Sequence, residues 1–469
     1  MKIDLLLGVI FYLIITLAVG IWAAKKETNT GEDFLVAGRR MNLFVMFWTL
    51  LATYVGAASV VGVAGWVYIR GLSQIWYTAG YVICLSGIGY ILAGKIRKFG
   101  VKTGAATISE FLEFRFGRKI RVLGAILVWF SIMAILAFQY IGMGKILSTI
   151  TGMNYSLAVI LTALIMIAYT TYGGMWSVAI TDVFQGIVGV IGLIFMMFYV
   201  LPEAGGFGSI IKNVPAEHFS LIGYVTPIQA LSAFLVFFLG FVPLPDWWQR
   251  AYSSKDEKTA QMGMVLGGLG YLLLAAIVYI IGFCGKVLYP NFADPEKILP
   301  TMVIDKAPIW LGAIIIGALL AIIMSTADSM LLIGTAQTIR DLYEMPFNRK
   351  LNDKQLLNAS RWITAALGIL VLIFVFLAPN MFSLWIMASD ILGATLAFPV
   401  LFGFLSNRSS ENSVLISALF GFIGWLAGYS GWKPIGAEPI LIGGVLSLIG
   451  IVIGDMIFPN KKDLSEILK

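Results

Sequence analysis

The chain has 469 residues, of which 59% are hydrophobic, 13% aromatic and only 12% charged. Soluble domains carry roughly 25% charged residues, so this composition excludes a soluble protein and predicts a membrane protein. Basic loops beside anionic lipid would account for the net charge of +7, so no nucleic-acid partner is needed. The single histidine, His218, excludes histidine-rich metal catalysis, and Cys84 and Cys284 lie in predicted spans as apolar fillers.

Apolar stretches long enough to cross a bilayer recur from end to end. The first is no cleaved signal peptide, because it is too long, carries Asp4 where basic residues belong and ends at Lys25 and Lys26. We predict thirteen transmembrane helices, at 4–24, 42–69, 74–94, 120–148, 154–172, 177–200, 227–250, 262–287, 308–340, 357–378, 381–405, 411–428 and 437–458.

Lys and Arg gather in alternate loops. One set carries clusters at 25–40, 95–119, 250–258, 340–354 and 461–469, whereas the other set holds only scattered basic residues. The positive-inside rule then places the N-terminus outside and the C-terminus in the cytoplasm of a plasma-membrane protein. Arg250 counts here among the cytoplasmic loop cations. An odd number of spans agrees with this orientation.

Two of the predicted helices are interrupted in their middle. The span 42–69 is broken by small residues at 54–59, and the span 227–250 by Gly240, Pro243 and Pro245. These are the second and the seventh helices, and matched interruptions in two halves indicate an inverted-repeat transporter with its site at the breaks. Two ordinary kinked helices are the alternative interpretation.

The ninth helix carries the sequence STADS at 325–329 within an apolar stretch. At helical spacing Ser325, Asp328 and Ser329 share one face, with Thr326 one step round it. Facing lipid, these groups would be costly, so they must face a protein interior. Oxygen ligands without imidazole or thiolate suit a hard cation, whereas hydrogen-bonded contact between helices is the alternative.

The chain resembles the sodium/solute symporter family over nearly its whole length. The matching strings are DFLVAGR at 33–39, YGGMWSVAITDVFQ at 172–185, WQR at 248–250, STADS at 325–329 and LWIMASD at 384–390, and some are closest to the choline and proline branches. The resemblance implies an all-α, LeuT-type 5+5 inverted-repeat fold with sodium as the coupled ion. It divides the chain into an extra helix and loop at 1–41, repeats at 42–200 and 227–405, and two further helices with a tail at 411–469.

The resemblance also implies site residues. The family's conserved sodium site would take carbonyl and hydroxyl oxygens from Ala52, Val55, Ile322, Ser325 and Thr326. A second cation, sodium or a proton, would lie among Asp182, Ser325, Asp328 and Ser329. Asp182 has an alternative interpretation as a helix N-terminal residue near the inner interface.

Residues around the two breaks are the predicted substrate site: Tyr54, Ser59, Phe138, Gln139, Leu244, Asp246, Trp247 and Trp385, with Trp248 and Ser389 nearby. Aromatic rings beside a carboxylate suit a small zwitterion or amine, although Asp246 can instead pair with Arg250, four residues on. An organic acid or a sugar is the alternative solute. A sodium-binding sensor or a channel is the alternative class, and the short, histidine-poor loops do not suit an enzyme.

Overall fold

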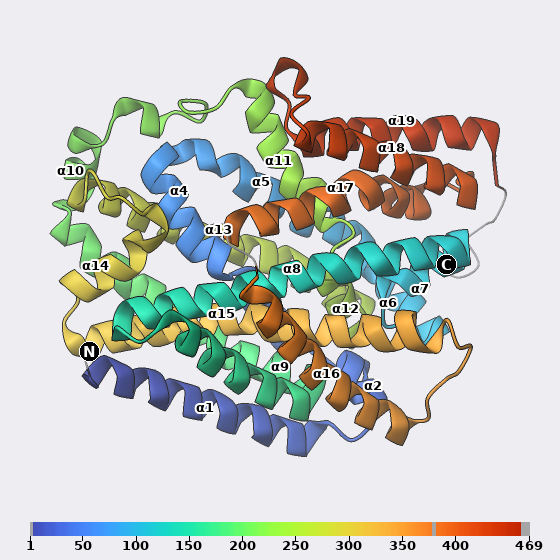
Figure 1. The fold of residues 1–469 in the computed structure, drawn as a ribbon, viewed down its shortest axis with the longest axis horizontal. Helices are drawn as coiled ribbons and strands as arrows, with labels where there is room; N and C mark the ends of the chain where they lie inside the picture. The colour runs from blue at the N-terminus through green and yellow to red at the C-terminus, as the bar shows by residue number, and fades with distance from the viewer. Residues whose placement is uncertain (1–2, 378–380, 461–469) are drawn as a thin grey trace.

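The computed structural model describes residues 3–377 and 381–460, and it is helical throughout, with only one isolated β-bridge, between Met41 and Ser254, in this part of the chain. The axes of most of the long helices lie roughly along the long axis of the molecule (Figure 1). Helix α1 lies along one edge of the bundle, and α18 and α19 lie along the opposite edge (Figure 1).

The N-terminal half begins with α1 and a short α2 and continues through the first group of spans. The bounds are α1 Ile3–Glu27, α2 Gly31–Val36, α3 Leu43–Tyr54, α4 Val63–Arg70, α5 Ile75–Ile83, α6 Gly89–Thr103, α7 Ile108–Phe116, α8 Arg118–Thr151 and α9 Tyr155–Glu203. A π-helical turn precedes α4 and another joins α5 to α6, so α5 and α6 form one passage.

The C-terminal half repeats the pattern of a broken helix followed by long spans. The bounds are α10 Gly206–Asn213, α11 Pro227–Phe241, α12 Pro245–Ser253, α13 Glu257–Leu288, α14 Ile298–Lys306, α15 Ile309–Gln337, α16 Asp353–Val375, α17 Met381–Leu405, α18 Glu411–Tyr429 and α19 Pro439–Ile457. Helix α15 continues as a π-helical segment, Thr338–Glu344.

Ten helical stretches in the described residues are long and apolar enough to cross a membrane, and the bent pair α11–α12 makes eleven. Two of the ten are 46 and 49 residues long, more than twice the length that crosses a bilayer. Each contains a glycine with positive φ, Gly71 at 56° and Gly174 at 58°, at which the helical path is interrupted. Counting two passages for each, the arrangement agrees with the thirteen predicted spans.

Gly174 divides α9 where the chain meets α2. Its φ of 58° and ψ of −150° are not helical, and a Cβ there would lie 2.7 Å from the carbonyl oxygen of Phe34. Only glycine fits both the backbone conformation and this close approach. The 172–185 string therefore marks a corner between two passages, which separates the two predicted spans at 154–172 and 177–200.

Both predicted helix breaks are present. Helix α3 ends at Tyr54, Val55 leaves the helical region with φ −96° and ψ 75°, and a π-helical turn at Ala58–Gly62 restarts the helix. The second break bends the chain by 41° between α11 and α12. The indoles of Trp247 and Trp248 donate hydrogen bonds to carbonyl oxygens at the end of α11, at 2.7 and 3.1 Å. These bonds supply donors to carbonyls at the helix end, where the i to i+4 backbone pattern stops; Phe241 O also accepts from the Leu244 N–H at 3.2 Å.

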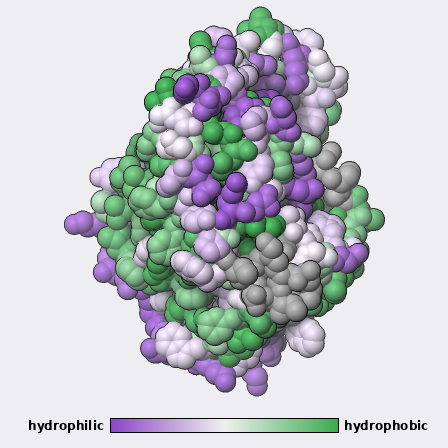
Figure 2. Space-filling view, turned by 90° about the vertical axis from the view of Figure 1, so that its left-hand side faces the viewer, coloured by the Kyte–Doolittle hydropathy of each residue, from purple (hydrophilic) through white to green (hydrophobic). Residues whose placement is uncertain are grey.

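Helix α15 lies at the centre of the bundle and packs against α9, α8 and α3. In the apolar stretch of α15, 83% of the residues are buried, against 39% in those of α1 and α16, which lie at the periphery. Figure 2 looks onto the end of the molecule where α10 and α14 lie, with hydrophilic residues across its centre and hydrophobic residues along its left flank. Because α15 is the most buried of these helices, its STADS face is surrounded by protein and not by lipid.

Candidate functional site

The hydroxyl of Ser325 lies where α15 meets the first break. It donates to the carbonyl oxygens of Ala52 at 3.0 Å and of Ile322 at 2.9 Å, and Ser325 is fully buried. In an unbroken helix the Ala52 carbonyl would accept from the backbone N–H four residues on. The break after Tyr54 exposes this carbonyl to α15 instead, so three of the five predicted sodium ligands meet here.

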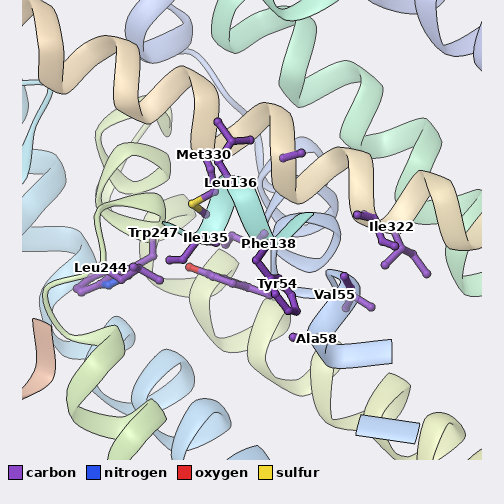
Figure 3. Packing of buried hydrophobic residues seen from close by; sticks show 14 of the residues in the cluster. Tyr54, Val55, Ala58, Ile135, Leu136, Phe138, Leu244, Trp247, Ile322 and Met330 are labelled. Atoms are coloured by element: carbon purple, nitrogen blue, oxygen red, sulfur yellow. The ribbon is translucent and has the colours of Figure 1, made fainter. Parts of the chain in front are cut away.

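The neighbouring hydroxyl of Thr326 bonds the next carbonyl of α3. It donates to Thr53 O at 2.8 Å, and the Ala57 N–H, which would serve Thr53 O in a continuous helix, donates instead to Gln139 Oε1 at 3.1 Å. Val55 lies on the broken segment opposite Ile322 (Figure 3), with its N–H bonded to Leu51 O. The predicted ligands therefore gather around the break, and Thr53 joins them although the sequence did not single it out.

The second predicted cation site contains a guanidinium. Arg250 is fully buried, and its Nη2 donates to Thr53 Oγ1 at 2.6 Å and to Ser329 Oγ at 2.5 Å. The same nitrogen lies 3.5 Å from Asp182 Oδ2, which also accepts from the Thr49 hydroxyl. The assignment of Arg250 to a cytoplasmic loop was wrong, because the bend before α12 turns this side chain into the bundle.

Asp328 lies on the other side of the same network. Its Oδ2 accepts from the Tyr169 hydroxyl at 2.7 Å, and its Oδ1 is 3.5 Å from Ser329 Oγ. Asp182, Asp328 and Arg250 are each fully buried, so the network holds two carboxylates and one guanidinium and is one positive charge short of neutrality. Buried charge is costly unless it is paired. The hydroxyl of Ser325 bonds to carbonyls of the first site and to neither carboxylate.

The two breaks enclose a small central cavity of about 30 Å³. Five residues predicted for the solute line it: Tyr54, Ser59, Gln139, Leu244 and Asp246. The ring of Tyr54 crosses the view in Figure 3 with its hydroxyl directed towards the side on which Leu244 and Trp247 lie. A volume of this size has room for about two water molecules at most, so the cavity is closed around its polar groups.

Asp246 has an unused acceptor in this cavity. Its Oδ1 accepts from the Trp247 N–H at 2.8 Å, whereas its Oδ2 and the Tyr54 hydroxyl are buried without a hydrogen-bond partner among the described residues. Arg250 reaches only the backbone oxygen of Asp246, at 3.3 Å, and its ion pair is with Asp182. The alternative pairing of Asp246 with Arg250 is therefore wrong.

Other residues predicted for the solute site make hydrogen bonds at the helix breaks or lie beside them. Ser59 donates to Tyr54 O at 2.9 Å, and Gln139 accepts from the first break as described above. Trp247 binds the end of α11, and Phe138 lines a separate cavity of about 20 Å³ between α8 and the first break. The side chain of Trp385 lies outside the described residues.

Sequence reasoning missed several residues of these sites. Tyr81 and Phe241 line the central cavity. Thr49 donates a hydrogen bond to Asp182, and Tyr169 donates one to Asp328. An available signal for Arg250 was its position inside a predicted span, where a cation is expected to face a functional interior. In the described residues no group of three or more His, Cys, Asp or Glu side chains could hold a metal ion. Carbonyls and hydroxyls are therefore the groups that suit a cation here.

A bundle with two broken helices, buried hydroxyls facing a break and a closed central cavity defines an ion-coupled membrane transporter. The chain belongs to the sodium:solute symporter family, whose model matches residues 34–421. It is 25% identical to the sodium/pantothenate symporter of Escherichia coli (strain K12), over 97% of each chain. It is 31% identical to the high-affinity choline transporter 1 of Drosophila melanogaster, over 84% of this chain and 65% of that protein.

Solved structures share the fold. A Na⁺-coupled sialic acid symporter matches with a TM-score of 0.86 at 19% identity, over 98% of this chain and 99% of that chain. Mhp1, a nucleobase-cation-symport-1 family transporter, matches with a TM-score of 0.62 at 16% identity, over 92% and 96%. The predicted family and LeuT-type fold are confirmed, and sodium is the coupled ion of this multi-pass membrane symporter.

Proposed function

We propose that the chain imports a small zwitterion or organic cation by alternating access, driven by sodium bound where α15 meets the first break. The observation that carries the solute class is the free Oδ2 of Asp246 in the central cavity, beside the unpaired Tyr54 hydroxyl. A buried carboxylate oxygen without a donor is stabilised by an ammonium group, and the Tyr54 ring adds a surface for cation–π contact. The chain acts as a transporter and not as an enzyme.

The sodium ion would be held by Ala52 O, Val55 O, Ile322 O, Ser325 Oγ and Thr326 Oγ1. Ser325 Oγ is already within hydrogen-bond distance of both Ala52 O and Ile322 O, and both hydroxyls can turn their protons away to offer lone pairs. This set joins α3 to α15, so an ion bound here would hold the broken helix against the central helix. Coupling requires such a link between the ion and the element that moves.

A second cation would bind near Asp182, Asp328 and Ser329. The support is the charge imbalance of the buried network, in which one guanidinium faces two carboxylates. A sodium ion or a proton would balance it, and the free Oδ1 of Asp182 is an available acceptor. Arg250 also bonds α12 to α3 and α15, so this network would have to rearrange when these elements separate.

The clusters of Lys and Arg support an N-terminus outside the cell and a C-terminus in the cytoplasm. One sodium entering across about 100 mV supplies roughly 2.3 kcal/mol. A tenfold sodium gradient adds about 1.4 kcal/mol, and together they sustain a solute gradient of roughly 500-fold. A single coupled sodium is therefore enough for useful uptake.

Two of the relatives are named for their solutes, which are pantothenate, an anion, and choline, a cation. An organic acid would meet the Asp246 carboxylate in the central cavity, and the guanidinium of Arg250 does not line that cavity. Like charges disfavour this arrangement. Choline offers the ammonium group but no anionic part, so it stays within the proposed class.

The test is uptake of labelled choline, glycine betaine and pantothenate into proteoliposomes with and without an inward sodium gradient. We expect sodium-dependent uptake of an ammonium-bearing solute, and loss of that uptake in Asp246→Asn. Sodium-driven uptake of pantothenate alone would contradict the solute class while leaving sodium coupling intact.

A further inference from the structure

A second and much larger cavity lies between α5, α11 and α17. Its volume is about 370 Å³, and residues that matter to its chemistry are Trp66, Arg70, Tyr77, Tyr224, Asp390 and Tyr429. Sites for small molecules typically measure about 300–1,000 Å³. This space, the α5/α11 cavity, can therefore hold a small solute in this conformation, whereas the central cavity, closed to about 30 Å³, would have to open before it could take one.

An aromatic cluster separates the two cavities. Tyr77 lines the α5/α11 cavity and contacts Phe237, with ring centroids 5.5 Å apart. Phe237 contacts Phe241 at 5.4 Å, and Phe241 contacts Tyr81 at 4.4 Å. Tyr81 in turn contacts Tyr54, at 5.1 Å, on the wall of the central cavity. The cavities are thus in series, with a layer of rings between them.

Asp390 presents an unpaired carboxylate to the α5/α11 cavity. It is only 2% exposed and makes no hydrogen bond or ion pair with any described residue. Its Oδ1 is fully buried without a partner. Buried carboxylates are normally paired, because an unpaired one loses its hydration without compensation. A cationic group in the cavity would supply the missing partner.

Arg70 presents the opposite charge to the same cavity. Its guanidinium lies over the ring of Trp66, 4.2 Å from the centroid, and makes no hydrogen bond or ion pair within the described residues. The stacked ring fixes the plane of the guanidinium and leaves its N–H donors available. By contrast, Glu438 on the same wall is already paired with Lys433 at 2.5 Å. Among the described residues, the cavity is therefore lined by one carboxyl group and one guanidinium that lack a hydrogen-bond or ion-pair partner.

We infer that the α5/α11 cavity is a binding site for a small zwitterion, which it holds before the aromatic cluster opens to the central cavity. Arg70 binds the carboxylate through paired N–H donors, and Asp390 binds the ammonium group. Tyr77 and Tyr429 flank this ammonium with aromatic rings. The inference rests on the proposed function, since it narrows the proposed solute class to zwitterions.

The test is calorimetric titration of the purified protein in lipid nanodiscs, in sodium-free buffer, with two matched probes. Glycine betaine and choline share a trimethylammonium group and differ in that betaine carries a carboxylate where choline carries a hydroxymethyl. We expect betaine to bind at least about tenfold more tightly than choline, because only betaine satisfies both charges. Arg70→Gln should remove this preference, and Asp390→Asn should weaken both probes.

Arg361→Gln is the matched control. Arg361 also lies over an aromatic ring, that of Tyr172, but outside the cavity, so this variant should bind betaine as the unaltered protein does. A second measurement does not depend on altering a charge. Ile386→Cys places a thiol on the cavity wall one helical turn before Asp390, and the two native cysteines are buried. A methanethiosulfonate reagent at this thiol should block betaine binding, and betaine should slow the labelling.

Equal binding of betaine and choline, or betaine binding that persists in Arg70→Gln, Asp390→Asn and labelled Ile386→Cys, would overturn the inference. Sodium-driven uptake measured on the same preparations separates it from the proposed function. Uptake of an ammonium-bearing solute without betaine binding in the cavity would refute this site and leave the proposed function intact. Betaine binding that requires Arg70 and Asp390, without sodium-driven uptake, would support this site and refute the proposed function.

Discussion

Replacing Ser325 by alanine tests the sodium site most directly, because one hydroxyl links both elements of the site. That hydroxyl contacts Ala52 O and Ile322 O at 3.0 and 2.9 Å in the fully buried contact between α3 and α15. Losing a buried polar partner costs about 1–3 kcal/mol. In the sodium-free protein, alanine also leaves the two carbonyls without the Ser325 donor. The substitution therefore destabilises the sodium-free state as well, and only the difference between the two states weakens sodium binding. The remaining loss, about 1–1.6 kcal/mol, corresponds to a roughly 5- to 15-fold higher sodium requirement.

The assay is initial uptake into proteoliposomes as a function of external sodium, at saturating solute. Ser417→Ala is the matched control, because its hydroxyl is equally buried and donates to Ser447 O at 2.8 Å in α18–α19, away from the breaks. We expect the sodium concentration for half-maximal uptake to rise in Ser325→Ala and to stay constant in Ser417→Ala. An unchanged sodium requirement in a Ser325→Ala protein that still transports would refute the site.

Three further predictions concern buried charge and pH. Arg250→Met should lower the free energy of unfolding by about 3–5 kcal/mol, because Asp182 loses its ion-pair partner among the described residues and stays buried near Asp328. Adding Asp182→Asn should restore part of this stability, and additive losses in thermal unfolding would argue against this network. Asp246→Asn should weaken an ammonium-bearing solute by about 2–5 kcal/mol in competition assays, whereas unchanged affinity would remove Asp246 from the site. Burial lowers the pKa of His218, which contacts Tyr224 Oη at 2.7 Å and Tyr68 O at 3.2 Å and lies near Lys286 and Glu217. The folded protein therefore binds this proton less readily than the unfolded chain, so stability should fall as the pH drops below about 6.5. His218→Gln should reduce that fall between pH 7.5 and 5.5, and an identical pH profile would contradict the assignment.

Local sequence determined the membrane class, the spans and the breaks. Apolar length decides which segments cross a bilayer, and proline and small residues interrupt a helix wherever they stand, so these features need no knowledge of neighbouring helices. The grouping of Ser325, Asp328 and Ser329 on α15 likewise follows from helical spacing alone. Helical spacing could not join Ala52 to Ser325, which lie on different helices; the family resemblance placed them in one site, and the structure brings them into contact.

Only the tertiary structure decided which groups from different helices meet. Arg250 was predicted in a cytoplasmic loop. In the structure it lies on α12, which a 41° bend directs into the bundle, so that its side chain reaches Asp182 on α9. Trp247 donates its indole N–H to a backbone carbonyl at the second break. Arg70 and Asp390 are distant in sequence but line the same cavity. Helix rotation and crossing angle set these contacts, and they arise from packing over the whole bundle rather than from any local pattern of residues.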